Sequence, residues 1–224
     1  MEIVRKQKTL HHAVSMIGGF MAGYTIFNHL DIMANAQTGN LVKLVLSACS
    51  GNLESIGFMV LLFFVYCAAN AFYVVCRRYS RLSMKIISLL LTVAAIPLVG
   101  LLCFSGNAYL SVLPIVFAMP VQWNAFKTAG GNSSSTIFSS NNVRQAVIQL
   151  TNYIMDRDAK SARNARFYWA TLLFFHIGVA ASCLISLYFS SQSIWFCYIF
   201  VGLAVAAYYR YETEKIRAFS GTEK

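Results

Sequence analysis

Apolar runs alternate with short polar stretches along the whole chain, and six of these runs are long enough to form transmembrane helices. They cover about residues 12–32, 55–76, 84–104, 109–126, 167–189 and 193–209. A helix of about 20 apolar residues crosses the hydrocarbon core of a bilayer. The pattern predicts an all-α polytopic membrane protein with about six transmembrane helices, forming a single transmembrane domain over residues 1–224.

Two further segments, 38–50 and 140–155, have a helical apolar pattern but are too short or too polar to cross comfortably. Each begins at a polar turn, Thr38-Gly39-Asn40 in one case and Ser140-Asn141-Asn142 in the other. A half-helix that enters the membrane and returns is permitted where protein or a water-filled cavity surrounds it. We expect both segments to be such half-helices; the alternative, in which both cross and give eight spans, is less favoured.

The basic residues indicate how the chain is oriented. Fifteen of the 18 Lys and Arg residues lie in four segments that six spans place on one side, namely 5–8, 77–85, 157–166 and 210–224. Positive residues concentrate in cytoplasmic loops. Both termini are therefore expected in the cytoplasm, with 210–224 as a basic cytoplasmic tail. Lys43, Lys127 and Arg144 are the three exceptions.

Composition excludes several functional classes. The chain is 58% hydrophobic and 12% charged, and its net charge of +10 is explained by the cytoplasmic loops without nucleic-acid binding. Its six cysteines form no CxxC pair and have no His at metal-ligand spacing, so neither a disulfide framework nor a zinc site is expected. No GxSxG, HExxH or P-loop motif is present, so we expect neither an enzyme nor a cofactor.

The N-terminus allows two interpretations. Basic residues precede the first apolar run, and Ala34-Asn35-Ala36 resembles a signal-peptide cleavage site. The run is long for a signal peptide and polar residues interrupt its end, so an uncleaved first span is favoured. Gly18, Gly19, Ala22 and Gly23 form a stripe on this span that suits close helix packing.

An internal repeat appears at an offset of 102 residues. Thr38-Gly39-Asn40 then aligns with Ser140-Asn141-Asn142, and Val45-Leu46 aligns with Val147-Ile148. Each half, about 12–104 and 109–210, runs as span, polar turn, short helix, span and span. Three spans per half give the halves opposite orientations, so we expect two inverted three-helix repeats, a common transporter design with its site where the halves meet. The alternative is that any six-span chain can be divided in two.

The ordered pair "GGFMAGYTIF … ANAQTGNLVKLVLS" and "AMPVQWNAFK … SSTIFSSNN" resembles the two half-signatures of the YoaK-like family of small bacterial integral membrane proteins. The resemblance covers about residues 12–210 and rests on the ordered pair of signatures, because the TGN turn alone is not specific. It implies a small multi-pass protein of the bacterial inner membrane without an established activity. The family's Asp position falls on Ala22, so a role that needs this carboxylate is lost or moved. Its second TG turn is Ser140-Asn141 here.

The polar turns supply the candidate site. Thr38, and Ser139 or Ser140, are expected to cap the two short helices, whose N-terminal N–H groups and dipoles attract anions. Lys43 and Arg144 lie in the first turns of these helices, and each either snorkels to the interface or contributes charge to a polar cavity. The expected lining of the site is Thr38, Gly39, Asn40, Lys43, Gln122, Asn124, Ser140, Asn141, Asn142 and Arg144.

Three other polar residues have simpler expected roles. Asn70 is expected to join two helices by a hydrogen bond, and His176 to be hydrogen-bonded in the packing, with a proton relay as its alternative. Asp31 is expected at the outer interface, with pairing to Lys43 as the alternative.

These features favour a small-solute transporter or permease in the lipid bilayer, with a site between the repeat halves for a small anionic or zwitterionic solute. The alternative is a non-transporting membrane scaffold or sensor, which could be a homodimer and in which the polar turns serve packing only.

Overall fold

The computed structural model describes residues 2–29, 32–104 and 108–220. Six long α-helices match the six apolar runs: α1 (Glu2–Asn28), α3 (Leu53–Tyr79), α4 (Met84–Phe104), α5 (Ala108–Ala125), α7 (Ala159–Phe189) and α8 (Cys197–Ser220). Two shorter helices, α2 (Gln37–Ser50) and α6 (Ser140–Asp156), occupy the segments expected to be half-helices. A 3-10 turn, η1 (Ser190–Phe196), joins α7 to α8. The predicted all-α class and the positions of all eight helices are confirmed.

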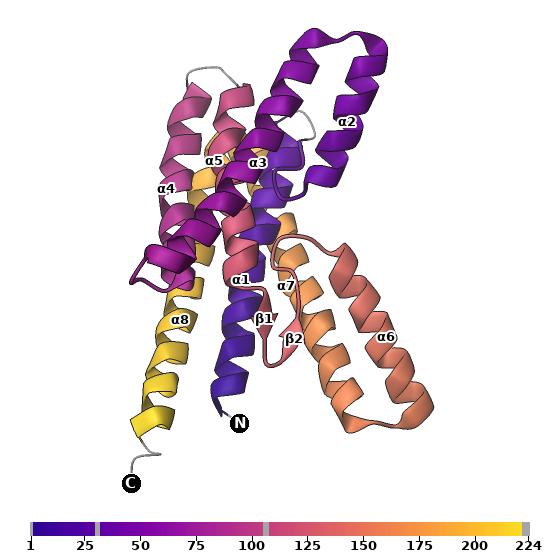
Figure 1. The fold of residues 1–224 in the computed structure, drawn as a ribbon, viewed down its shortest axis with the longest axis vertical. Helices are drawn as coiled ribbons and strands as arrows, with labels where there is room; N and C mark the ends of the chain where they lie inside the picture. The colour runs from indigo at the N-terminus through magenta and orange to yellow at the C-terminus, as the bar shows by residue number, and fades with distance from the viewer. Residues whose placement is uncertain (1, 30–31, 105–107, 221–224) are drawn as a thin grey trace.

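Helix α1 lies in the middle of the molecule, with α7 and α8 along it (Figure 1). Its stripe of small residues faces α7 so closely that a Cβ atom at Gly19 would overlap the carbonyl oxygen of Phe175. Gly178 on α7 meets the carbonyl oxygen of Met16 in the same way. The two backbones therefore touch with no side chain between them, which is the use expected for the glycine stripe.

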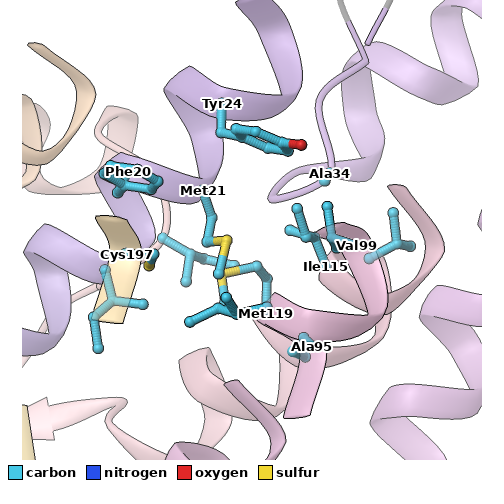
Figure 2. Packing of buried hydrophobic residues seen from close by; sticks show 14 of the residues in the cluster. Phe20, Met21, Tyr24, Ala34, Ala95, Val99, Ile115, Met119 and Cys197 are labelled. Carbon is cyan, nitrogen blue, oxygen red and sulfur yellow. The ribbon is translucent and has the colours of Figure 1, made fainter. Parts of the chain in front are cut away.

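The largest hydrophobic cluster joins α1 to α4, α5 and α8 (Figure 2). Phe20, Met21 and Tyr24 come from α1, and they pack near Met119 of α5 and Cys197 of α8. The Tyr24 hydroxyl donates to the carbonyl of Ser191 at 2.8 Å, so the one polar group of this ring is satisfied within the core.

Three helical stretches among the described residues are long and apolar enough to cross a bilayer: Leu53–Tyr79, Met84–Phe104 and Ala159–Ala218, the last of which contains α7, η1 and most of α8. Helices α1 and α5 are not among these three stretches, and both are largely buried in protein. The apolar runs of the sequence thus differ in character according to their surroundings.

Both short helices turn sharply into the long helix that follows. Gly51 ends α2 with a φ of 70°, and Asn52 then caps α3 by accepting from the Ser55 N–H at 3.1 Å. At the other turn Arg157 ends α6 with a φ of 54°, and Asp158 caps α7 by accepting from the N–H groups of Lys160 and Ser161. These hydrogen bonds hold the pKa of Asp158 below its usual value. Each left-handed residue followed by an Asn or Asp cap therefore makes a compact helical hairpin.

A small hairpin lies between α5 and α6. Strands β1 (Thr128–Ala129) and β2 (Asn132–Ser133) pair antiparallel across Gly130 and Gly131, whose φ angles of 57° and 80° suit a two-residue turn. These two-residue strands were not predicted, because strands this short show no alternating pattern of apolar and polar residues. The hairpin directs residues 134–139 back along α1 toward the middle of the molecule (Figure 1).

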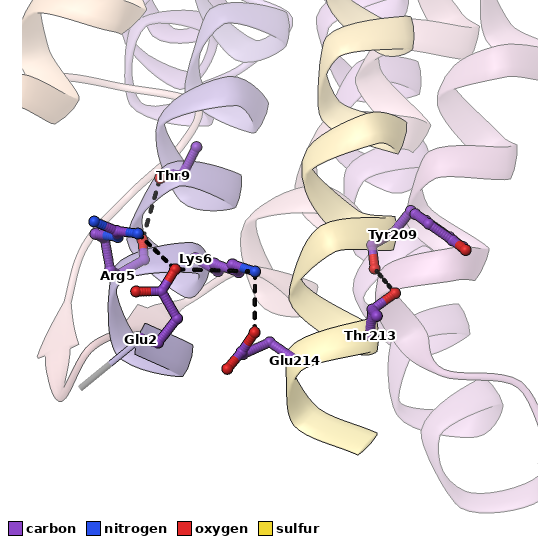
Figure 3. Close-up of polar contacts among 7 residues, drawn as sticks. All are labelled: Glu2, Arg5, Lys6, Thr9, Tyr209, Thr213 and Glu214. Atoms are coloured by element: carbon purple, nitrogen blue, oxygen red, sulfur yellow. Dashed lines mark hydrogen bonds and ion pairs between the residues drawn. The ribbon is translucent and has the colours of Figure 1, made fainter. Parts of the chain in front are cut away.

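The start of α1 and the end of α8 lie at the lower end of the molecule, where the α6–α7 turn also lies (Figure 1). Helix α1 begins at Glu2, ten residues before the expected span, and α8 continues to Ser220 through most of the expected tail. Lys6 Nζ of α1 contacts Glu214 Oε2 of α8 at 3.0 Å, and Arg5 pairs with Glu2 at 2.6 Å (Figure 3). The extra helical turns are thus joined by ion pairs outside the apolar part of the fold, so an apolar pattern alone could not locate their ends.

Candidate functional site

Two asparagine side chains hold the two polar turns in place, and they do so in the same way. Asn40 of α2 reaches back seven residues, accepting from the N–H of Met33 at 3.3 Å and donating to its carbonyl at 3.1 Å. Asn142 of α6 also reaches back seven residues, accepting from the N–H of Ser135 at 3.2 Å and donating to its carbonyl at 2.7 Å. Both asparagines are 1% exposed. We call these two contacts the amide clasps; each folds an extended segment against the start of its short helix.

The two extended segments meet at Asn35. Its amide nitrogen donates to the carbonyl of Gly18 on α1 at 2.7 Å and to the carbonyl of Ile137 at 2.8 Å. Ile137 lies 102 residues after Asn35, which is the repeat offset. One side chain thus joins the segment before α2 to the segment before α6 and ties both to the central helix.

The starts of α2 and α6 have no side-chain cap. Helix α2 begins at Gln37, so Thr38 lies inside its first turn, and the N-cap position is occupied by Ala36. Ser139 is at the N-cap of α6, but its side chain makes no capping hydrogen bond. The predicted caps are therefore wrong. The physical reason is that Asn40 and Asn142 fix the preceding backbone, which sets the helix starts without a hydroxyl cap.

A cavity of about 810 Å³ lies between the two helix starts, and we call it the inter-turn cavity. It contacts Gln37, Thr38 and Gly39 of α2 together with Ser139 and Ser140 before and in α6. In Figure 1 these starts face each other on the same side of α1, with α2 running toward the upper end and α6 toward the lower end. Leu41 of α2 also lines it, and the remaining lining comes from α1, α3, α5, α7 and the extended segments: Ala22, Gly23, Ile26, Met33, Asn35, Ala36, Tyr66, Trp123, Ile137, Phe138, Phe175, His176 and Val179.

The chemistry of this lining is mostly apolar and aromatic, with polar atoms gathered at the helix starts. Asn35 is 4% exposed, and its Oδ1 has no hydrogen-bond partner among the described residues. The same holds for both polar side-chain atoms of Gln37, which are buried. His176 Nδ1 lies 2.8 Å from the carbonyl of Leu172 and donates to it, as expected for a histidine hydrogen-bonded in the packing. Unused hydrogen-bonding capacity in a concave apolar site is typical of ligand binding.

One family model, described as a protein of unknown function (DUF1275), matches residues 10–207. The chain belongs to the DUF1275 family. Neither the curated proteins nor the solved structures include a match to this chain. The matched region contains both amide clasps and the whole lining of the inter-turn cavity. The resemblance to YoaK-like proteins is compatible with this family.

In this DUF1275 protein, three of the ten expected site residues line the inter-turn cavity: Thr38, Gly39 and Ser140. Asn40 and Asn142 form the amide clasps instead. Asn141 accepts a hydrogen bond from Arg144 at 3.2 Å on the exposed side of α6. The polar turns therefore do come together, but two of their asparagines support the backbone rather than face the space.

Gln122 and Asn124 bond neighbouring elements. Gln122 is buried and donates to the carbonyl of Val14 and to the hydroxyl of Thr136, both at 3.3 Å. Asn124 donates to Asn70 on α3 at 3.0 Å, which gives Asn70 its expected interhelical role. Trp123, which lies between them, is the residue of this stretch that lines the cavity.

Neither expected cation lines the inter-turn cavity. Lys43 is half-buried on α2, and Arg144 is exposed on α6. Each lies in the second turn of its helix, and neither contacts the cavity. Asp31, the alternative partner of Lys43, lies outside the described residues.

Asn35, Gln37 and Trp123 also line the inter-turn cavity, although the sequence did not predict them as site residues. The signal for Asn35 was available: it aligns with Ile137 in the repeat and lies in the middle of the polar stretch 35–40. Gln37 is the first residue of α2, one residue before the expected start of this helix at residue 38.

Replacing either clasp asparagine by alanine is expected to destabilise the protein by about 2–3 kcal/mol, because each removal breaks two hydrogen bonds of a buried asparagine. Asn142→Ala also removes the side-chain partner of the buried Ser135 N–H and C=O, and Asn40→Ala removes that of the Met33 N–H. The melting temperature of the purified protein should fall by roughly 5–10 °C for Asn40→Ala and for Asn142→Ala. Asn141→Ala is the matched control and should shift it little. A neutral result for both clasp variants would contradict the role assigned to them.

Proposed function

We propose that this protein is a small-solute transporter, permease-like in design, whose solute site is the inter-turn cavity. The single observation that carries the proposal is that this cavity contacts the starts of two short helices that run in opposite directions and have no side-chain caps. Uncapped helix starts direct N–H groups and positive dipole ends at a common space. Short helices that meet in this way near mid-membrane form the solute sites of many secondary transporters.

The proposal places α1, α3, α4, α5, α7 and α8 across a bacterial inner membrane as six spans, with both termini in the cytoplasm. Three apolar stretches and the one-sided distribution of basic residues support this arrangement. Apolar side chains on the outer surface of α2 and α6, such as Val45 and Ile154, suit a lipid environment. The two short helices would then be half-helices that enter from opposite sides and return.

We further propose two inverted repeats, α1–α4 and α5–α8. The amide clasps support this, because corresponding residues of the two clasps are 102 residues apart: Met33 corresponds to Ser135, and Asn40 to Asn142. The two helical hairpins support it too. Gly51 and Arg157 end the short helices in a left-handed conformation, and Asn52 and Asp158 cap the long helices that follow. The offset is 103 between the first residues of α2 and α6 and 106 at the turns, because α6 has 17 residues and α2 has 14.

Single cysteines introduced into a cysteine-free variant should report this topology. In intact cells an impermeant maleimide is expected to label Ser50→Cys and Gln192→Cys but not Ser80→Cys or Arg157→Cys, because the first pair faces outward. Permeabilised cells should allow all four to react. Labelling of Ser80→Cys and Ser50→Cys from the same side would contradict six spans.

Transport itself is tested in proteoliposomes that contain the purified protein. A panel of radiolabelled small anionic and zwitterionic solutes is offered under a solute gradient or a pH gradient. We expect saturable uptake of at least one solute, and competition by an excess of the same unlabelled solute. Absence of flux for the whole panel, with protein that is monodisperse before reconstitution, would contradict the proposal.

A membrane scaffold or sensor, with dimerisation as one form, is the second candidate. The observation that favours it is that the side-chain amides of Asn40 and Asn142 are used fully in backbone contacts, so the clasps have a sufficient role in packing. It does not account for an 810 Å³ cavity at the starts of two helices without side-chain caps. A scaffold predicts no flux and no solute binding, with stability losses in the clasp variants.

A further inference from the structure

A second cavity, of about 500 Å³, lies between α1, α7 and α8, and we call it the α1–α8 groove. It shares no lining residue with the inter-turn cavity. One face of α1 within residues 2–16 forms one wall, and one face of α8 within residues 203–210 forms the other. Phe174 of α7 completes the lining. The groove therefore runs along the helices, from the start of α1 toward the middle of the fold.

The charged side chains of the groove gather at the end where α1 begins. Arg5 and Lys6 come from the first turns of α1, and Arg210 comes from the second half of α8. Glu2 is the one acidic residue among the described residues of the lining, and it pairs with Arg5 at 2.6 Å (Figure 3). Lys6 contacts Glu214 of α8 at 3.0 Å. Even with Glu214 counted, this end of the groove carries excess positive charge.

Arg210 is the cation that is not neutralised by protein at this end. It is exposed, and its guanidinium makes no ion pair or hydrogen bond to another residue within 2–29, 32–104 and 108–220. A guanidinium presents a planar fork of N–H donors that matches the oxygens of a phosphate group. An anion can therefore bind Arg210 without breaking an existing pair.

The other end of the groove is apolar. Met16 is buried and Phe174 is half-buried, whereas Leu203 is 50% exposed at the surface of α8. Phe174 stacks on His12, with ring centroids 5.2 Å apart and planes 11° apart, so this wall is held in place. Met16 lies about 16 Å along the helix from Arg5. The groove thus separates a basic end from an apolar end along its length.

A ligand with an anionic head and a hydrocarbon tail fits this arrangement. Basic pockets between transmembrane helices bind the head groups of anionic lipids, and burial of an acyl chain removes apolar surface from water. We propose that the α1–α8 groove binds an anionic phospholipid. Its phosphate contacts Arg210 and Arg5, and one acyl chain lies against Met16, Phe174 and Leu203. The proposal goes beyond the solute site and holds for a transporter and for a scaffold alike.

Lipid titration of the delipidated protein in detergent tests the proposal, with native mass spectrometry as the measure of bound lipid. Phosphatidylglycerol and phosphatidylethanolamine with identical acyl chains are the probes, and inorganic phosphate is the competitor. Phosphatidylglycerol should bind at least about fivefold more tightly than phosphatidylethanolamine, the effect of one unit of charge near basic residues. Excess inorganic phosphate should not displace it, because phosphate has no chain to bury.

Substitutions at the basic end separate recognition from general surface charge. Arg210→Gln should weaken phosphatidylglycerol binding about fivefold and leave the melting temperature of the lipid-free protein unchanged. Arg217→Gln is the matched control, since Arg217 lies on the same helix but does not line the groove, and it should bind normally. Glu2→Gln should bind phosphatidylglycerol more tightly, because it frees Arg5 from its carboxylate. A gain of this kind cannot arise from damage to the fold.

A substitution at the apolar end tests the acyl chain. Ala206→Trp fills this part of the groove and should weaken phosphatidylglycerol binding at least about tenfold. Val205→Trp adds the same side chain to the adjacent position of α8, which is 48% exposed and outside the groove, and should leave binding unchanged.

Two sets of results would overturn the proposal. Equal affinity for the two phospholipids, or equal losses in Arg210→Gln and Arg217→Gln, would mean that the groove does not recognise the head group. Displacement by inorganic phosphate, together with normal binding by Ala206→Trp, would show a site for a soluble anion instead. Neither result bears on the solute site, because the groove and the inter-turn cavity have no residue in common.

Discussion

Gly19→Ala is expected to prevent α1 and α7 from assembling as they do in the native fold. The added methyl group would overlap the carbonyl oxygen of Phe175, which belongs to the backbone of a helix and has no flexible side chain to move aside. Overpacking a core typically costs 1–3 kcal/mol, and a backbone clash at the central helix pair should reach about 3 kcal/mol or more. Gly178→Ala should behave similarly, because its methyl group would meet the carbonyl of Met16.

The measurement is the yield of monodisperse protein and its melting temperature in detergent. Both Gly19→Ala and Gly178→Ala should reduce the yield severely and lower the melting temperature of what remains. Gly202→Ala is the matched control: it lies in α8 with nothing within 4 Å of the added Cβ, so it should be neutral or slightly stabilising. A native melting temperature for Gly19→Ala would show that the two helices are not in backbone contact.

Thr38→Trp is expected to abolish solute uptake while leaving the fold intact. Thr38 is exposed to the inter-turn cavity in the first turn of α2, so an indole there would occupy the space needed by a solute. We expect uptake in proteoliposomes to fall at least tenfold, a loss of about 1.4 kcal/mol or more in binding free energy. The melting temperature should change little because no packed side chain is displaced.

Two variants control this experiment. Val45→Trp adds the same side chain to the outer surface of α2, where Val45 is 62% exposed, and should leave uptake unchanged. Thr38→Ser keeps the small polar side chain and should also transport normally. Equal uptake by Thr38→Trp and wild type would mean that the solute path avoids the cavity.

The sequence was sufficient to locate all eight helices, because each has an apolar periodicity that a helix must bury or expose to lipid. The two short helices were recognisable from their length and from the polar turns before them. The apolar pattern did not distinguish α1 from α3, because both are apolar runs. In the structure α1 is enclosed by protein, whereas α3 is largely exposed. That difference depends on which helices pack together, and this is set by contacts such as Gly19 with Phe175.

The candidate site was predictable as a place but not as a set of contacts. Thr38, Gly39 and Ser140 line the inter-turn cavity as expected, because helix starts that face each other present their first residues to the gap. Asn40 and Asn142 lie on the same turns, yet their side chains point back to the preceding backbone. Sequence spacing alone does not say whether an asparagine will satisfy a buried N–H or face a cavity; both uses lower the free energy of the fold.

Hydration of the two polar turns decides whether a solute site lies between them. In a cysteine-free variant that elutes as folded protein, Thr38→Cys and Ser140→Cys are exposed to a small water-soluble thiosulfonate in membrane vesicles open on both sides. The cavity account predicts that both react at rates within about tenfold of Ser50→Cys, a position at the end of α2, and that both are protected by a transported solute. Rates as low as that of Val45→Cys on the lipid-facing surface of α2, at both positions, would mean a dry centre and would contradict a solute site between the two turns.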